Sequence, residues 1–180
     1  TFGFQVTFFR SRIDEAQSLR SAFAAKHLVF AHAALTDLKG RRLWHDQRIA
    51  RVGMGVASAS EDDTDIRLRD WSLKRQADGS YAAHVPSSDF SLELAFAPTQ
   101  PPVLQGEAGL SRKGAAPNET SYYYSEPQLS VRGRIGLQEQ RFELNQGRAW
   151  LDHEWSETIM SPQAVGWDWI GMNLHDGSAL

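Results

Sequence analysis

Tryptophan, histidine and acidic residues are concentrated in two short stretches near the end of the chain. Gly147–Ser156 and Gly166–Gly171 together contain four of the six tryptophans. Between these indoles lie four residues that could exchange a proton or stabilise a charge: Asp152, His153, Glu154 and Asp168. Burial beside indoles and charge–charge contacts can bring the pKa values of such groups towards neutrality. The two stretches therefore predict acid–base chemistry on an apolar substrate.

The first stretch has the alternation of a β-strand. Successive strand side chains point to opposite faces, so the acids would share one face and the imidazole would lie beside an indole on the other. The expected faces are Trp150, Asp152 and Glu154 on one side and Leu151, His153 and Trp155 on the other. Gly166–Gly171 alternates as well, which predicts a hairpin between the two stretches with its turn at Ser161–Pro162.

A second interpretation of these stretches remains open. Tryptophans are often core residues, and charged groups crowd against indoles inside many β-barrels. In that case the carboxylates would form ion pairs with nearby arginines and would have no chemical role. The candidate partners are Arg132, Arg134, Arg141 and Arg148.

Spacing argues against a metal or a cofactor. His153–Glu154 begins like the helical motif of zinc proteases, but the second histidine position is occupied by Glu157. The chain has no cysteine, which excludes disulfides, thiolate metal sites and a cysteine nucleophile. Asp152, His153 and Ser156 have the residue types of a hydrolase triad, yet neighbours on one strand cannot converge as nucleophile, base and orienting acid. We predict no metal and no cofactor.

Composition excludes several classes of protein. The chain has 180 residues, of which 41% are hydrophobic, and this is ample for a core. Its 19 basic and 22 acidic residues give a net charge of −3, with no basic block for nucleic acid. No apolar run approaches the ~18 residues of a membrane span. We predict a globular protein that binds no nucleic acid.

The chain is predicted to be almost entirely β. Phe2–Arg10 and Lys26–Asp37 alternate apolar and polar residues, and Lys39–Gly40 supplies a turn. Further strands are expected at Ile66–Lys74, Tyr81–Val85 and Phe90–Phe96. Only Ile13–Phe23 has near-helical spacing, which fits a short helix or an ordered loop. His32 shares a strand face with Leu28, Phe30 and Ala34, either as a core histidine or as a pocket histidine.

Proline and glycine concentrate between Pro98 and Asn118, and we place a domain boundary there. The predicted domains are 1–115 and 116–180. The second would begin with strands at Ser121–Ser125, Gln128–Leu137 and Phe142–Asn145. The chain begins at Thr1 within a predicted strand and stops at Leu180 just after a predicted turn. We therefore expect this chain to be part of a longer protein.

Six motifs in order resemble one known family. They are Phe2–Arg10, Phe30–Asp37, Leu104–Ser111, Ser121–Ser125, Trp150–Trp155 and Gly166–Trp169. Together they resemble the lipocalin-like family that includes carotenoid 1,2-hydratases (CrtC) and AttH-like proteins, often labelled predicted secreted hydrolases. The resemblance implies two consecutive lipocalin-like antiparallel β-barrels, both truncated in this chain. It also implies a secreted or periplasmic protein, with membrane association only through a segment before Thr1.

The resemblance also points to site residues. Carotenoid hydratases have a His-x-Trp pair, which His153 and Trp155 match, and a later Tyr-x-Asp pair. Trp167-Asp168-Trp169 lies near the expected place of the second pair but has no tyrosine. The predicted catalytic residues are His153, Asp152, Glu154 and Asp168. The predicted ligand contacts are Trp155, Trp167, Trp169, Tyr123 and His32.

The sequence and the resemblance favour an enzyme that adds water to, or otherwise protonates, an apolar unsaturated small molecule such as a polyene, lipid or polyketide. His153 would be the principal acid–base group, and one of the three acids its charge partner. The tryptophans would wall the pocket and stabilise a cation. Two alternatives remain: a non-catalytic lipocalin-like carrier of a hydrophobic molecule, and an esterase-like hydrolase.

Overall fold

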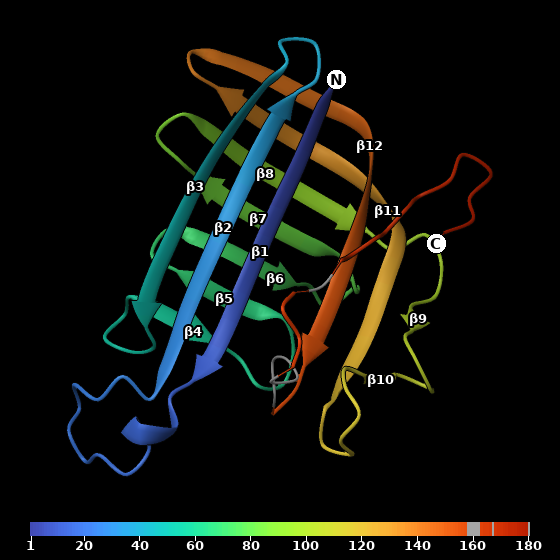
Figure 1. The fold of residues 1–180 in the computed structure, drawn as a ribbon. Helices are drawn as coiled ribbons and strands as arrows, with labels where there is room; N and C mark the ends of the chain where they lie inside the picture. The colour runs from blue at the N-terminus through green and yellow to red at the C-terminus, as the bar shows by residue number, and fades with distance from the viewer. Residues whose placement is uncertain (158–162, 167, 180) are drawn as a thin grey trace. The chain divides into compact units, whose positions relative to one another are not determined.

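The computed structural model describes residues 1–157, 163–166 and 168–179 (Figure 1). These residues form an all-β fold, as predicted, and their one helical element is a single turn of 3-10 helix. None of their helices is long and apolar enough to cross a membrane. The strands are β1 Phe2–Arg12, β2 His27–Asp37, β3 Arg42–Arg51, β4 Ala57–Ala59, β5 Asp65–Leu68, β6 Trp71–Arg75, β7 Tyr81–Pro86, β8 Phe90–Ala97, β9 Val103–Leu104, β10 Leu110–Arg112, β11 Thr120–Leu137 and β12 Gln140–Trp155.

The chain divides into two compact units. The first comprises Thr1–Ala95 and Arg132–Leu144, and the second comprises Phe96–Val131 and Asn145–Leu180. The long strands β11 and β12 each contribute residues to both units. The predicted boundary between two family domains near residue 115, and the two truncated barrels themselves, stay predictions.

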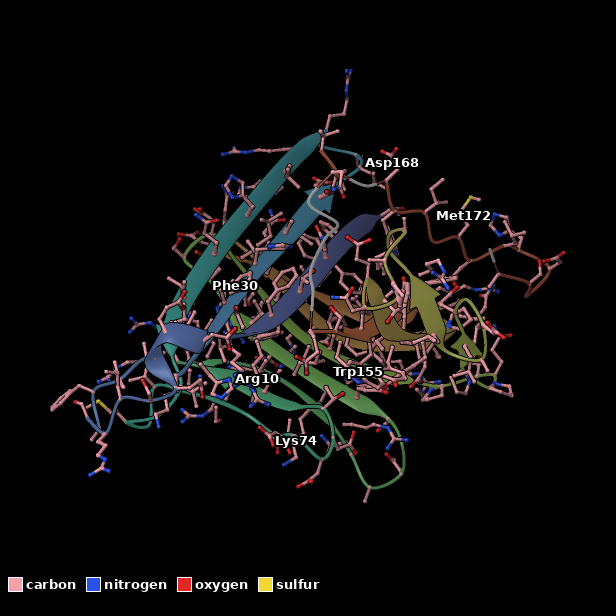
Figure 2. The ribbon with its side chains drawn as sticks, turned by 60° about the horizontal axis from the view of Figure 1, so that its bottom comes forward. Arg10, Phe30, Lys74, Trp155, Asp168 and Met172 are labelled. Atoms are coloured by element: carbon pink, nitrogen blue, oxygen red, sulfur yellow. The ribbon has the colours of Figure 1, made fainter. Side chains whose placement is uncertain are left out.

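One sheet of the first unit is formed by β1, β2 and β3, joined in that order. All pairs are antiparallel, from Phe2 opposite Asp37 to Arg12 opposite His27. The side chains of Arg10 and Phe30 project from β1 and β2 (Figure 2). The predicted strands at 2–10 and 26–37 are therefore confirmed, and the turn at Lys39–Gly40 joins β2 to β3.

The other sheet of the first unit contains β4 to β8 in sequence order. Strand β2 contacts β4 and β5, so the two sheets pack face to face, and their strands cross at a steep angle (Figure 1). The core between them is made of buried alternate residues from each sheet: Val29, Ala31, Ala33, Leu35, Leu68, Trp71, Tyr81, Ala83, Val85, Leu92 and Leu94. Burial of one face of each strand is what the alternating sequence predicts.

The single strand predicted at Ile66–Lys74 is wrong. Arg69 has a φ of 57°, in the left-handed region, and the chain turns there between β5 and β6. The two short strands then pair with each other, with Leu68 opposite Trp71. The alternation of apolar and polar residues breaks at this turn, where Arg69 and Asp70 are both polar. This break is the sequence signal of the turn, and the single-strand prediction ran across it.

The near-helical stretch Ile13–Phe23 contains only one 3-10 turn, at Asp14–Ala16. Ala16 is buried, but the side chains of Leu19 and Phe23 are exposed. A helix this short gains little from propensity and needs a buried apolar face. The side-chain amide of Gln17 instead donates to the carbonyls of Ile13 and Lys26 and closes the stretch as an ordered loop.

Strand β11 joins two predicted strands into one. The chain passes through Pro127 without ending the strand, because Gln128 adopts a φ of 56° and the pairing resumes beyond it. Likewise β12 runs through Phe142–Asn145 and on to Trp155. The predicted hairpin is wrong: the described residues of Gly166–Gly171 form no strand, and β12 pairs with β11. Its turn, Ser161–Pro162, lies outside the described residues.

We expect Gly133→Ala to destabilise the first unit by about 1–3 kcal/mol. Gly133 lies in β11 with a φ of 140°, and a Cβ atom there would clash with the backbone oxygen of Glu93 in β8. Chemical denaturation of both proteins measures the difference. Gly166→Ala is the control, because a Cβ built at Gly166 has no atom of the other described residues within 4 Å, its chain neighbours aside. An unchanged midpoint for Gly133→Ala would contradict the close approach.

Candidate functional site

The strands of the second unit present two chemically different faces. Strand β11 pairs with β9 and β10, and also with β12. Tyr122 lies opposite Leu110 and Tyr124 opposite Leu104, so each pair shares a face. We call one side the aromatic face, made of Leu104, Leu110, Tyr122, Tyr124, His153 and Trp155. The other is the acidic face, made of Ser121, Tyr123, Ser125, Trp150, Asp152 and Glu154.

The rings of the aromatic face contact one another across β11 and β12. Tyr122 stacks on Trp155 with ring centroids 5.5 Å apart, and His153 meets the edge of Trp155 at 5.4 Å. Tyr124 completes the group, with its ring 6.4 Å from that of Trp155. These contacts confirm the prediction that an imidazole lies beside an indole on one face of the strand.

His153 is half-buried and makes a hydrogen bond that fixes its ring. Its Nδ1 atom is 2.9 Å from the hydroxyl oxygen of Tyr124. The sequence predicts one of the three acids as the charge partner of His153, whereas the partner at Nδ1 is a phenol. Because a hydroxyl can donate or accept, it can serve the imidazole in either protonation state.

Much of the aromatic face is accessible to solvent. Trp155 is 51% exposed, Tyr122 56%, Leu104 57% and Leu110 40%. An exposed group of aromatic and aliphatic side chains is typical of a surface that binds an apolar ligand or another apolar surface. The imidazole of His153 lies among them.

The acidic face is a hydrogen-bonded network. Asp152 accepts bonds from the hydroxyl of Ser125 at 2.6 Å and from the indole N–H of Trp150 at 2.8 Å. Glu154 accepts from the hydroxyl of Ser121 at 2.6 Å and forms an ion pair with Lys113 at 2.6 Å. Both serines are buried.

Asp152 and Glu154 therefore point away from His153. Their carboxylates and the imidazole lie on opposite faces of β12, so any electrostatic effect on the imidazole would have to act through the strand. The cation that pairs with Glu154 is Lys113. The second interpretation of the sequence proposes arginines as the partners of these carboxylates. Arg134 pairs with Glu93 and Glu143, and Arg148 donates to the side-chain carbonyl of Gln128.

Tyr123 belongs to the acidic face. Burial and the nearby Asp152 carboxylate raise the pKa of its phenol above the ordinary value of 10.0, while a hydrogen bond from Trp169 opposes the rise. The indole nitrogen of Trp169 lies 3.3 Å from the phenol oxygen, and the ammonium of Lys113 lies 5.0 Å from the ring centroid. The predicted ligand contacts Tyr123 and Trp169 are thus neighbours, on the side opposite His153.

We expect Asp152→Asn to lower the pKa of Tyr123 while leaving it above 10.0. The substitution removes the negative charge that disfavours the phenolate, but burial, the larger cause, remains. Ultraviolet difference titration against Tyr123→Phe isolates this phenol from the other tyrosines. A Tyr123 titration identical in Asp152→Asn and in the parent protein would show that the two groups are not coupled.

The remaining predicted site residues lie elsewhere. Asp168, which Figure 2 labels, is exposed and lies in no strand. Trp167 lies outside the described residues. His32 belongs to the first unit, where it is half-buried with its ring 5.6 Å from that of Phe9. It points away from the core face of β2, so the structure does not place it among core residues.

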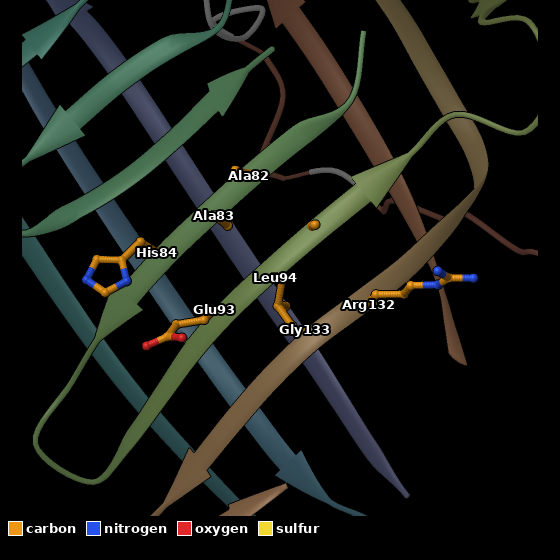
Figure 3. Close-up of a pocket in the computed structure, with 8 residues that line it drawn as sticks. Ala82, Ala83, His84, Glu93, Leu94, Arg132 and Gly133 are labelled. Carbon is orange, nitrogen blue, oxygen red and sulfur yellow. The ribbon is translucent and has the colours of Figure 1, made fainter. Parts of the chain in front are cut away.

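A shallow depression on the first unit was not predicted from the sequence. Figure 3 shows it on β7, β8 and β11, lined by Ala82, Ala83, His84, Glu93, Leu94, Ala95, Arg132 and Gly133. A second hollow in the other unit is lined by Lys113, Gly114, Ala115, Ala116, Glu119, Gln163 and Ala164. Among the described residues no group of histidine, aspartate and glutamate side chains has the geometry of a metal site.

Sequence reasoning missed the partners that β11 supplies. In the stretch 121–125, Ser121, Tyr123 and Ser125 share one face and Tyr122 and Tyr124 share the other. Residues 150–155 have a matching alternation of acidic and ring side chains. The signal was therefore present. What the sequence did not contain is that these two stretches are adjacent strands in matching register.

Comparison with known proteins supports one family. A crystal structure of a protein designated as an AttH, from Nitrosomonas europaea, is 47% identical with a TM-score of 0.87 over 99% of this chain, which spans 53% of that protein. Kievitone hydratase from Nectria haematococca shares the fold at 13% identity and a TM-score of 0.61, over 75% of this chain and 41% of that one. No curated protein matches the sequence. The AttH-like family model matches residues 1–180, and the chain belongs to that family.

Proposed function

We propose that this chain is part of an enzyme that adds water to, or otherwise protonates, an apolar unsaturated small molecule. The observation that best supports this proposal is the aromatic face. There the ring centroids of His153 and Trp155 are 5.4 Å apart on an exposed apolar surface. The fold shared with a kievitone hydratase is compatible with such chemistry, although a shared fold does not fix a reaction. Because the chain spans about half of its AttH relative, the activity proposed is that of the longer protein.

The chemistry needs one proton donor and one cation stabiliser. The protonated imidazole of His153 gives its proton to one carbon of a double bond, which leaves a carbocation on the other. The electron-rich face of Trp155 stabilises that cation. The oxygen of a water molecule bonds to the cationic carbon, and the surplus proton returns to His153. The sum is the addition of one water, and the histidine is regenerated.

The remaining parts of the proposal rest on the family resemblance. We propose a lipocalin-like, two-barrel protein that is secreted or periplasmic and binds a polyene, lipid or polyketide-like molecule. Trp167 and Trp169 would contribute to the pocket wall, and Asp152, Glu154 and Asp168 to its charge. Kinship with carotenoid hydratases belongs to this proposal too.

The test is incubation of the full-length protein with candidate polyenes and with ester substrates, followed by mass spectrometry of the products. We expect a polyene to gain the mass of one water without cleavage. Cleavage of esters without hydration would favour the hydrolase alternative. Tight binding of a hydrophobic molecule that is recovered unchanged would favour the carrier.

A further inference from the structure

We propose that Tyr124 is a positioning residue for His153: its hydroxyl holds Nδ1 of the imidazole and so fixes the orientation and the tautomer of the ring that exchanges a proton with the substrate. This inference rests on the proposed acid–base function of His153 and adds to it a residue that no sequence motif assigned. It begins from the 2.9 Å contact between the two side chains.

The surroundings of the pair fix its geometry. Tyr124 lies within β11, paired with Leu104 of β9 on one side, and His153 lies within β12. The tyrosine ring is tilted 51° to the imidazole with centroids 5.2 Å apart, and Trp155 meets the imidazole at 66°. The imidazole therefore contacts a ring from each strand and has a hydrogen bond at Nδ1. Sites on paired strands hold side chains more precisely than sites on loops.

A phenol suits this reaction better than a carboxylate. Carbon–carbon double bonds are weak bases, so the donor must release its proton readily. A neutral hydroxyl stabilises the imidazolium less than a carboxylate does, because the carboxylate adds the attraction of a full opposite charge. The hydroxyl accepts from Nδ1–H when His153 is charged, and it still does so after the ring has given up the proton of its other nitrogen, because Nδ1 keeps its hydrogen. One residue thus supports the imidazole throughout the cycle. The carboxylates of Asp152 and Glu154 are on the other face.

Tyr124→Phe in the full-length protein tests the proposal, with Tyr122→Phe as the matched control. Both tyrosines lie on the aromatic face, but it is the hydroxyl of Tyr124 that contacts His153. We expect Tyr124→Phe to lower kcat by about 10–100-fold, the usual effect of removing an orienting partner of a functional histidine, with little change in KM. Tyr122→Phe leaves the contact between Tyr124 and His153 in place, so any loss of kcat that it causes should be smaller than that of Tyr124→Phe. Both variants should keep their melting temperature.

A second measurement does not depend on turnover. With ¹⁵N-labelled histidine, the His153 signals are identified by their loss in His153→Gln. We expect the Nδ1 chemical shift to change in Tyr124→Phe and to stay in place in Tyr122→Phe. If the parent protein hydrates no substrate, the proposed function fails and the Nδ1 shift alone decides this inference. If the parent is active, an unchanged kcat or an unchanged Nδ1 shift in Tyr124→Phe overturns the role of Tyr124 and leaves the proposed function standing.

Discussion

Replacing His153 with alanine is expected to lower kcat of the full-length protein by about 10²–10⁴-fold, the usual contribution of a general acid–base group. The imidazole is the titratable group of the aromatic face that can exchange a proton near neutral pH. Its loss removes the proton donor but leaves Trp155 and the apolar surface in place. Steady-state kinetics on the substrate identified by mass spectrometry measures the effect, and KM should change much less than kcat.

Stability separates a catalytic histidine from a structural one. Because His153 is half-buried, the alanine variant should lose no more than about 1–2 kcal/mol of the free energy of unfolding. His175→Ala is the matched control, since His175 lies in the same unit and is exposed. If turnover falls only in proportion to the unfolded fraction, His153 has a packing role and the carrier alternative gains support.

Trp71→Ala is expected to have the largest effect on folding, a loss of about 3–5 kcal/mol in the first unit. The side chain is 0% exposed in β6. Its indole N–H donates to the carbonyl oxygen of Pro86 at 2.7 Å, and the guanidinium of Arg48 lies 4.5 Å from the ring centroid. Alanine would leave a cavity and a cation without its aromatic partner, and the carbonyl of Pro86 would keep only the hydrogen bond from Arg48. Urea denaturation followed by circular dichroism measures the change.

Two controls divide that loss. Trp71→Phe keeps an aromatic ring for Arg48 but removes the N–H. Its loss of unfolding free energy should therefore be smaller than that of Trp71→Ala, with a difference of about 1–2 kcal/mol or more. Trp44→Ala removes an indole that is only half-buried in β3 and should cost less than either. A loss of under about 1 kcal/mol for Trp71→Ala would mean that this residue does not anchor the core.

The sequence by itself determined which residues share a face. Side chains alternate along any strand, so the division of residues 150–155 into an acidic side and an imidazole–indole side needed no partner strand. The same rule predicted β1, β2, β7 and β8 and the all-β class. The ordered motifs also led to the AttH-like family, which the family match confirms over the whole chain.

The tertiary structure decided which faces meet. Pairing of β11 with β12 brings Tyr124 to His153 and Ser125 to Asp152, although each pair is more than 25 residues apart in the chain. Strand register depends on hydrogen bonds between distant segments, and alternation within one segment does not contain that information. The same limit explains two errors: periodicity did not reveal that Gln128 carries β11 past Pro127, and at Ile13–Phe23 it could not show that Leu19 and Phe23 stay exposed. The error at Arg69 is different, because the alternation breaks at Arg69-Asp70 and the prediction ran across that break. Local pattern fixes the side to which a residue points, and contacts between distant segments fix what it touches there.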